Sequence, residues 1–292
     1  MLVVWGGIVR LTGSGLAIPD WPLAHGHVVP RPETRAVIEY VHRVLAMLVG
    51  LATLGLAVAV YASPRYRRPL GSTMTIALLV LAIQILMGGR VVLEALLVQR
   101  VVVHLLLAFV FFAIMLRMTL RAQDLAHGAS GTGAAGAPAV GPNGGPEGAG
   151  RRVRQLRAWS HAVAGLVFVQ AGLGAWVSSS GASLACPDFP TCQGTFFPRM
   201  EGLVGIHYTH RLGAYLVFAA VLGLSIRAAM VPLPPRARLP LRLAGILVTL
   251  QMILGIGNVV LGVPLAISAG HLATALALFG TLLVANHELS RL

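Results

Sequence analysis

The chain lacks lysine and carries few charges of any kind. Only 11% of its 292 residues are charged, against about 25% in a typical soluble domain, so an ordinary soluble globular protein is excluded. The two cysteines, Cys186 and Cys192, are too few for a disulfide-rich scaffold. All 22 basic residues are arginine, and the net charge is +13. This charge does not indicate nucleic-acid binding, because the arginines lie in short segments between apolar runs, where they orient membrane proteins.

Long apolar runs take the place of the missing charges. Hydrophobic residues make up 57% of the chain, and about 20 consecutive apolar residues suffice for a helix to cross a bilayer. The sequence therefore predicts an all-α, polytopic membrane protein with eight transmembrane helices embedded in the lipid bilayer. The expected spans are 1–11, 40–61, 73–89, 101–120, 158–177, 207–226, 241–260 and 269–285.

The two halves of the sequence resemble each other. The segment PDWP at 19–22 recurs as PDFP at 187–190, an offset of 168 residues. Further matches, at an offset of 167, pair Gln84 with Gln251, Gly88 with Gly255, and His104 with His271. Because each copy contains an even number of helices, both enter the membrane in the same direction. The predicted architecture is two tandem four-helix bundles related as a parallel repeat.

This repeat divides the chain into three parts. Residues 1–121 form the first four-helix half and residues 158–292 the second, with a Gly-, Ala- and Pro-rich cytoplasmic linker at 122–157 that cannot bury a core. At the 168-residue offset, the first apolar run has no counterpart to residues 158–168. Since a span needs about 20 residues, we expect the first helix to be truncated.

Arginine is distributed unevenly between alternate loops. The segments after the second, fourth and sixth apolar runs carry 13 arginines, whereas the opposite segments carry six. Loops rich in arginine stay on the cytoplasmic side of a membrane. The distribution therefore predicts that both termini are cytoplasmic. The long loop that follows the first run of each half is then expected at the outer face.

Four histidines occupy matched positions near the outer ends of the even-numbered runs: His42, His104, His210 and His271. Polar residues inside a membrane are costly and are by default a functional hypothesis. Histidines on facing helices of a bundle form a natural site for a haem iron with two axial imidazoles. The expected pairs are His42 with His104, and His210 with His271. Two alternatives stay open: histidines that merely bond neighbouring groups, and a zinc site, which needs three or four clustered ligands.

Glu39 marks a difference between the halves. It precedes His42 by three residues and shares its helix face, whereas His207 takes this position in the second half. A carboxylate beside a haem pocket can act as a base or stabilise a developing cation, which makes Glu39 the candidate catalytic residue. Its alternative role is an ion pair with Arg43. Arg43 and Arg211 either bind haem propionates or extend to the membrane interface.

Cys186 and Cys192 flank the Pro-Asp-aromatic-Pro turn of the second outer loop. The outer side of the membrane is oxidising, so we predict a disulfide between them. Ile18 and Ala24 stand at the corresponding positions of the first outer loop, which excludes a disulfide there. Both loops are placed to cap the haem pockets from outside.

Taken together, these motifs resemble the haem A synthase family. They are GIVRLTGSGL at 7–16, PDWP at 19–22, E-x-x-H-R at 39–43, His104, His210-Arg211 and His271. The resemblance covers nearly the whole chain apart from the linker. It implies an integral membrane oxidoreductase of the bacterial plasma membrane that converts the C8 methyl group of haem O to a formyl group, giving haem A.

The resemblance also implies a division of labour between the halves. His42 and His104 would face the substrate haem, with Glu39 as the catalytic carboxylate. His210 and His271 would ligate a haem b cofactor that relays electrons. Many members of the family carry a cysteine pair in the first outer loop, and this chain departs from that pattern.

Two other functions stay open at this point. One is a di-haem b electron-transfer protein with two equivalent sites and no need for Glu39. The other is a haem-delivery or assembly module without substrate chemistry. The expected partners are haem O and an electron acceptor of unspecified kind, with haem O synthase and cytochrome oxidase assembly factors as further candidates.

Overall fold

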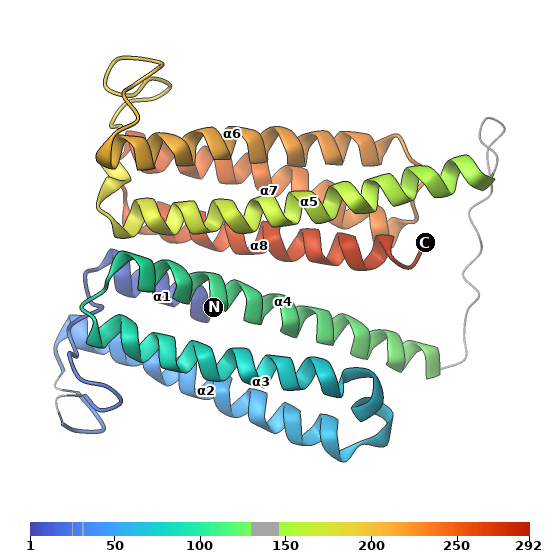
Figure 1. Cartoon of the computed structure of the whole chain (residues 1–292), viewed down its shortest axis with the longest axis horizontal. Coiled ribbons are helices and arrows are strands. Elements are labelled where there is room, and N and C mark those ends of the chain that lie inside the picture. The colour runs from blue at the N-terminus through green and yellow to red at the C-terminus, as the bar shows by residue number, and fades with distance from the viewer. Residues whose placement is uncertain (25, 31, 130–145) are drawn as a thin grey trace.

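The computed structural model describes residues 1–24, 26–30, 32–129 and 146–292, and this part of the chain is almost entirely helical (Figure 1). No β-strand occurs among these residues. The helices are α1 (Leu2–Leu11), α2 (Thr34–Ala62), α3 (Pro64–Leu93), α4 (Val98–Ala129), α5 (Pro146–Ser179), a 3-10 helix η1 (Ala182–Leu184), α6 (Gly202–Ala229), α7 (Pro235–Val260) and α8 (Leu265–Leu289). Seven of them are long and apolar enough to cross a membrane, and α1 is a shorter apolar helix of 10 residues. The predicted all-α polytopic fold is confirmed.

Several helices extend beyond the apolar runs from which they were predicted. α4 reaches Ala129 and α5 begins at Pro146, so helices enter both ends of the segment 122–157 that was predicted as a linker. The middle of that segment, 130–145, lies outside the described residues. Prolines begin α3 and α7 at Pro64 and Pro235. A proline in the first turn costs no hydrogen bond, because the first N–H groups of a helix have no partner within it.

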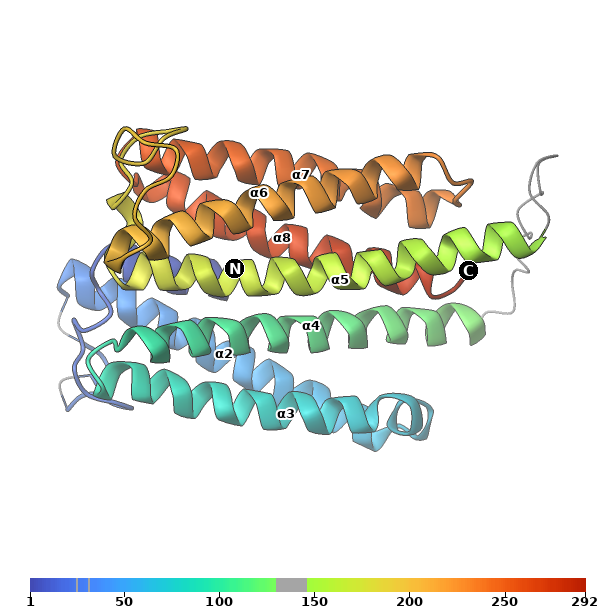
Figure 2. The same cartoon turned by 45° about the horizontal axis from the view of Figure 1, so that its top comes forward.

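The long helices run roughly along one axis, so the connections gather at two ends of the molecule (Figures 1 and 2). The long loops after α1 and α5 lie at one end, together with the short turns before α4 and α8. The turns after α2 and α6 lie at the other end. Consequently the four even-numbered helices all begin at the end that carries the long loops.

The two groups of four helices pack against each other through a shared core. α4 contacts α5 and α8, and α1 contacts α2 and α8. The ring of Phe109 on α4 lies 5.5 Å from the ring of Phe279 on α8. A β-carbon at Gly280 would lie 3.0 Å from the Phe112 ring, so glycine favours this close approach of α8 to α4. The two halves are therefore joined by well-packed apolar side chains.

The outward faces of the helices are strongly apolar. Large exposed hydrophobic residues on α2 and α3 are Met47, Leu48, Leu51, Leu54, Val58, Ile76, Leu79, Ile83 and Leu86. Exposure of such a surface to water would cost roughly 25 cal/mol for each Å², whereas lipid tails solvate it without that cost. The exposed surface therefore has the character expected of a protein surrounded by lipid.

Candidate functional site

Four buried or half-buried histidines lie at the end of the molecule that carries the long loops. Each lies within the first nine residues of an even-numbered helix: His42 of α2, His104 of α4, His210 of α6 and His271 of α8. At a rise of about 1.5 Å per residue, all four lie about 9–12 Å along their helices. The imidazoles of His42 and His104 are within electrostatic range of each other, as are those of His210 and His271. The structure thus brings His42 near His104 and His210 near His271.

Each of these imidazoles packs against a glycine of the preceding helix. A β-carbon built on the glycine would lie 3.0 to 3.2 Å from Cε1 of the histidine. The four contacts are Gly6 with His42, Gly88 with His104, Gly174 with His210, and Gly255 with His271. A larger residue at any of these glycines would displace the imidazole. Glycine therefore holds open the space in which each ring sits.

The donor set fits a haem with two axial imidazoles in each half. Buried Nδ1 atoms of His42, His104 and His271 have no hydrogen-bond partner within the described part of the chain. A buried Nδ1 without a partner is costly, and a hydrogen bond donated from Nδ1–H to a neighbouring group would satisfy it while Nε2 binds an iron. In the same part of the chain no three His, Cys, Asp or Glu side chains are grouped to hold a metal ion. Because a porphyrin supplies four nitrogens to its iron, two histidines are enough for a haem.

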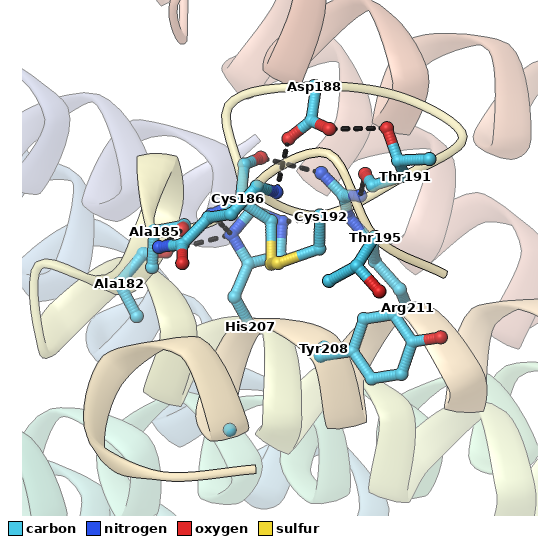
Figure 3. The surroundings of a disulfide bond; sticks show 12 residues. Ala182, Ala185, Cys186, Asp188, Thr191, Cys192, Thr195, His207, Tyr208 and Arg211 are labelled. Carbon is cyan, nitrogen blue, oxygen red and sulfur yellow. Dashed lines mark hydrogen bonds between the residues drawn. A yellow bond between two sulfur atoms is a disulfide. The ribbon is translucent and has the colours of Figure 1, made fainter. Parts of the chain in front are cut away.

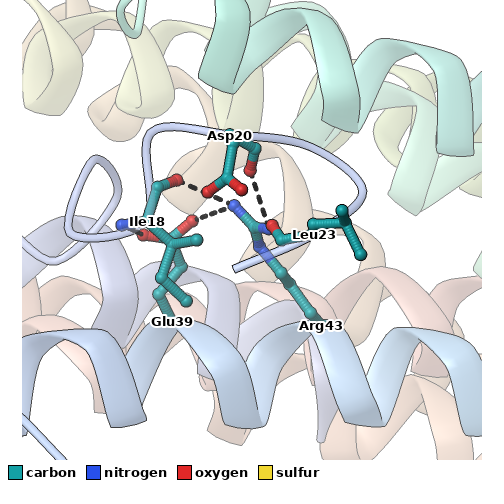
Figure 4. A network of polar contacts seen from close by, with 5 residues as sticks. All are labelled: Ile18, Asp20, Leu23, Glu39 and Arg43. Atoms are coloured by element: carbon teal, nitrogen blue, oxygen red, sulfur yellow. Dashed lines mark hydrogen bonds and ion pairs between the residues drawn. The ribbon is translucent and has the colours of Figure 1, made fainter. Parts of the chain in front are cut away.

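Glu39 and Arg43 join the start of α2 to the first outer loop (Figure 4). Glu39 is only 3% exposed. Its Oε1 accepts a hydrogen bond from Nη2 of Arg43 at 2.7 Å, and its Oε2 accepts one from the backbone N–H of Ile18 at 3.0 Å. Arg43 also donates to the carbonyl oxygens of Ile18, Asp20 and Leu23 at 2.9 to 3.0 Å. The ion pair expected as an alternative role of Glu39 is therefore present.

His207 and Arg211 hold the second outer loop in the same manner (Figure 3). Nδ1 of His207 lies 2.9 Å from the carbonyl oxygen of Ala182, and its Nε2 accepts a hydrogen bond from Nε of Arg211 at 3.2 Å. Arg211 donates further hydrogen bonds to the carbonyl oxygens of Cys186 and Thr191 at 2.6 and 2.8 Å. These two carbonyls lie 168 positions after those of Ile18 and Leu23, which Arg43 contacts. In this structure both arginines bind loop backbone.

The turn of the second outer loop is organised by Asp188. Its carboxylate accepts hydrogen bonds from the Thr191 hydroxyl and from the backbone N–H groups of Gly194, at 2.9 Å, and Gln193, at 2.7 Å. These hydrogen bonds, that of Thr191 first, lower the pKa of Asp188 to about 2. The carboxylate is therefore ionised at neutral pH. Gly194 has φ of +77°, a conformation that glycine adopts without strain.

The predicted disulfide between Cys186 and Cys192 is confirmed. The two Cα atoms lie 4.6 Å apart, and both residues are fully buried under the loop. Ile18 and Ala24, which occupy the corresponding positions of the first loop, are also buried, at 0% and 2% exposure. The first loop thus fills with apolar side chains the space that the disulfide fills in the second.

Replacing the disulfide by the first-loop pair, in the double variant Cys186→Ile/Cys192→Ala, is expected to lower the melting temperature without releasing haem. Closing a segment in which the cysteines are only six positions apart contributes about 2 kcal/mol. The measurement is thermal unfolding in detergent, with the wild type under reducing conditions as the control. Loss of haem at an unchanged melting temperature would contradict this structural role.

Glutamines contact three of the histidines, a feature that was not predicted from the sequence. Nε2 of Gln170 lies 2.9 Å from Nδ1 of His210, and Nε2 of Gln251 lies 3.1 Å from Nε2 of His271. A sequence signal was present, since α3, α5 and α7 each carry glutamine four residues before the glycine that faces a histidine: Gln84/Gly88, Gln170/Gly174 and Gln251/Gly255. Residues four apart share a helix face, so the shared spacing places each glutamine beside the same histidine as its glycine.

Comparisons with known proteins identify relatives of this chain. Residues 1–283 match the COX15-CtaA family, described as cytochrome oxidase assembly proteins. The chain is 30% identical to a heme A synthase of Nitrosospira multiformis over 337 residues, which cover 99% of this chain and 90% of that protein. It is 28% identical to a heme A synthase of Shewanella oneidensis, over 99% and 92%. A heme A synthase of Symbiobacterium thermophilum is 33% identical, over 77% and 70%.

The family match covers far more than half of the chain and includes all four histidines and both outer loops. The relatives match over nearly their full length as well as that of this chain. The chain therefore belongs to the COX15-CtaA family, and it is an oxidoreductase of the heme A synthase type.

Proposed function

We propose that this protein converts haem O to haem A by oxidising the C8 methyl group to a formyl group, near the outer face of the plasma membrane. The observation that carries the proposal is the placement of two histidine pairs at one end of the helices, with every imidazole against a glycine. The names of the relatives are consistent with this reaction. The family description as cytochrome oxidase assembly proteins agrees with a product destined for a terminal oxidase.

The two halves have different tasks in this proposal. His42 and His104 bind the substrate haem, and His210 and His271 bind haem b. The haem b iron supplies one-electron redox chemistry when it is bound. Oxidation of a methyl to a formyl group removes several electrons and adds one oxygen atom, so the second redox centre would pass these electrons one at a time to the external electron acceptor. Arg43 and Arg211 lie one residue after a ligand histidine, where each can bind a haem propionate in addition to the outer loop.

Glu39 is the proposed catalytic carboxylate. Its carboxylate is buried and paired with Arg43, and a carboxylate in this position can act as a base or stabilise a developing cation. His207 occupies the matching position in the second half and cannot supply a negative charge. This difference favours an enzyme with one reactive half over a symmetric di-haem electron carrier. It also disfavours a haem-delivery module, which would need no carboxylate in either half.

The membrane topology follows from the arginine distribution. We propose that the two halves are parallel repeats, with both termini in the cytoplasm and both outer loops on the opposite side. The disulfide between Cys186 and Cys192 then lies in an oxidising compartment, as disulfides generally do. The outer loops would cover the haem sites, and haem O synthase and oxidase assembly factors are the candidate partners.

Haem extraction tests the proposed reaction. Cells that produce haem O but no haem A are supplied with this chain, and their membrane haems are separated by chromatography and identified by mass. We expect haem A, or an intermediate hydroxylated at the C8 methyl, only in cells that carry the chain. The control is the same chain with the double variant His42→Ala/His104→Ala. If haem O stays unconverted while the protein is present and binds haem, the proposed reaction is wrong.

A further inference from the structure

Three of the four paired histidines contact a glutamine of the preceding helix, and the fourth does not. Gln170 donates from Nε2 to the carbonyl oxygen of His210 at 2.7 Å and approaches Nδ1 of the same residue at 2.9 Å. Gln251 and Gln84 lie 3.1 and 3.5 Å from Nε2 of His271 and His104. His42 has no such partner, because the position equivalent to Gln170 is Leu2.

A second pair of matched positions differs between the two halves, next to the first pair. A β-carbon on Gly213 would lie 2.2 Å from Oε1 of Gln170, so glycine is required where the amide sits. The corresponding residue of the first half, 168 positions earlier, is Leu45. The second half thus combines a glutamine with the space for it, and the first half has leucine at both positions. The missing glutamine contact concerns His42, whereas the other three histidines each have a glutamine partner.

The unpaired atoms around the other glutamines are chemically complementary. Within the described part of the chain, Oε1 of Gln84 and Oε1 of Gln251 are buried without a partner, as are Nδ1 of His104 and Nδ1 of His271. The amide Nε2 of each glutamine lies against the imidazole Nε2, so an iron at Nε2 would replace this contact, and an Nδ1–H donated to Oε1 would then satisfy both buried atoms. Histidines that bind metals generally donate their other N–H to such a partner, which fixes the ring and strengthens the ligand.

We infer that these glutamines are positioning residues that make haem binding permanent in the second half, and that His42 is the ligand that releases haem in the first. This inference rests on the proposed function, in which one haem stays and the other is exchanged at every turnover. Both ligands in the second half are held by an amide, and only His104 is held in the first. The substrate haem therefore enters and leaves on the side of His42.

The first test removes one glutamine contact without touching a histidine. In Gly213→Ala the new β-carbon displaces only the flexible end of Gln170, so the fold is retained, and Gln170→Leu reproduces the first-half residue. Gly165→Ala on α5 is the matched control, because a β-carbon there meets nothing within 4 Å. We expect haem b to pass to apomyoglobin about 10 to 100 times faster in the first two variants. Its reduction potential should rise, and the control should behave as wild type.

The second test transfers the glutamine to the first half. The double variant Leu2→Gln/Leu45→Gly gives His42 the surroundings of His210, with Leu45→Gly alone as the control for the weakened helix. We expect the variant to bind haem O more tightly and to release product haem about 10 to 100 times more slowly, with haem b unchanged. The measured quantities are the release rate to apomyoglobin and the electron paramagnetic resonance signal of each haem.

The outcomes separate this inference from the proposed function. If the wild-type protein makes no haem A, the proposed function is wrong, regardless of how the glutamine variants behave. A wild type that makes haem A overturns the inference alone if Gln170→Leu and Gly213→Ala keep haem b as firmly as the Gly165→Ala control. Slower release in Leu2→Gln/Leu45→Gly, together with faster loss of haem b in the second-half variants, supports it.

Discussion

Alanine in place of His210 or His271 is expected to empty the second half of haem b and to abolish haem A production. Both imidazoles lie against glycines of the preceding helix, Gly174 and Gly255, which leave space for the rings. Loss of a contact to a ligand typically weakens metal binding about 10 to 100-fold, and loss of the ligand itself costs at least as much. Without this redox centre, electrons from the substrate half have no acceptor inside the protein.

Matched variants in the first half make the prediction specific. His42→Ala and His104→Ala are expected to stop turnover while the low-spin spectrum of haem b persists. His161→Ala on α5 is the control, because this histidine is exposed and its ring only contacts the carbonyl oxygen of Arg157. Haem content is measured on purified protein by absorption spectroscopy. If only the first-half variants lost haem b, the first half would hold haem b and the second half the substrate, and the proposed assignment would be wrong.

The membrane fold could be predicted from the sequence because burial in lipid acts on long, uninterrupted segments. Runs such as 207–226 and 241–260 are apolar over enough residues to span a bilayer, and both lie within observed helices. The ends were less predictable. α2 begins at Thr34, ahead of the apolar run that starts at Tyr40, and its polar first turns contact the outer loop through the hydrogen bond from Ile18 to Glu39.

The candidate site was predictable where a side chain carries the signal and unpredictable where the backbone does. The four histidines follow from residue type and the repeat offsets of 168 and 167 positions, and the Cys186–Cys192 disulfide follows from the presence of both cysteines in one outer loop. The contacts of Arg43 do not, because three of its acceptors are carbonyl oxygens, which every residue possesses. The space above Gly213 is likewise a property of the packed helices and cannot be read from the glycine itself.

Replacing Glu39 with histidine is expected to reduce turnover by about 10² to 10⁴-fold while the protein keeps haem b and an ordered first loop. The second half shows that histidine can serve as the loop contact at this position, since His207 pairs with Arg211 and reaches the carbonyl oxygen of Ala182. Glu39→His therefore removes the carboxylate and preserves the anchor. The reciprocal variant His207→Glu is expected to retain activity. Turnover is measured as haem A formed per protein, and loop order as resistance to proteolysis.

Arg43→Leu is the complementary variant, because it keeps the Glu39 carboxylate and removes the hydrogen bonds that hold the first outer loop. It removes the donor to Oε1 of Glu39 and three bonds to loop carbonyls, and a buried charge that loses its partner typically costs about 3 to 5 kcal/mol. The loop between α1 and α2 should then become sensitive to protease. If Glu39 served only as an anchor, Arg43→Leu would impair turnover and Glu39→His would not. A large loss of turnover in Glu39→His, with the loop still protected, assigns the chemistry to the carboxylate.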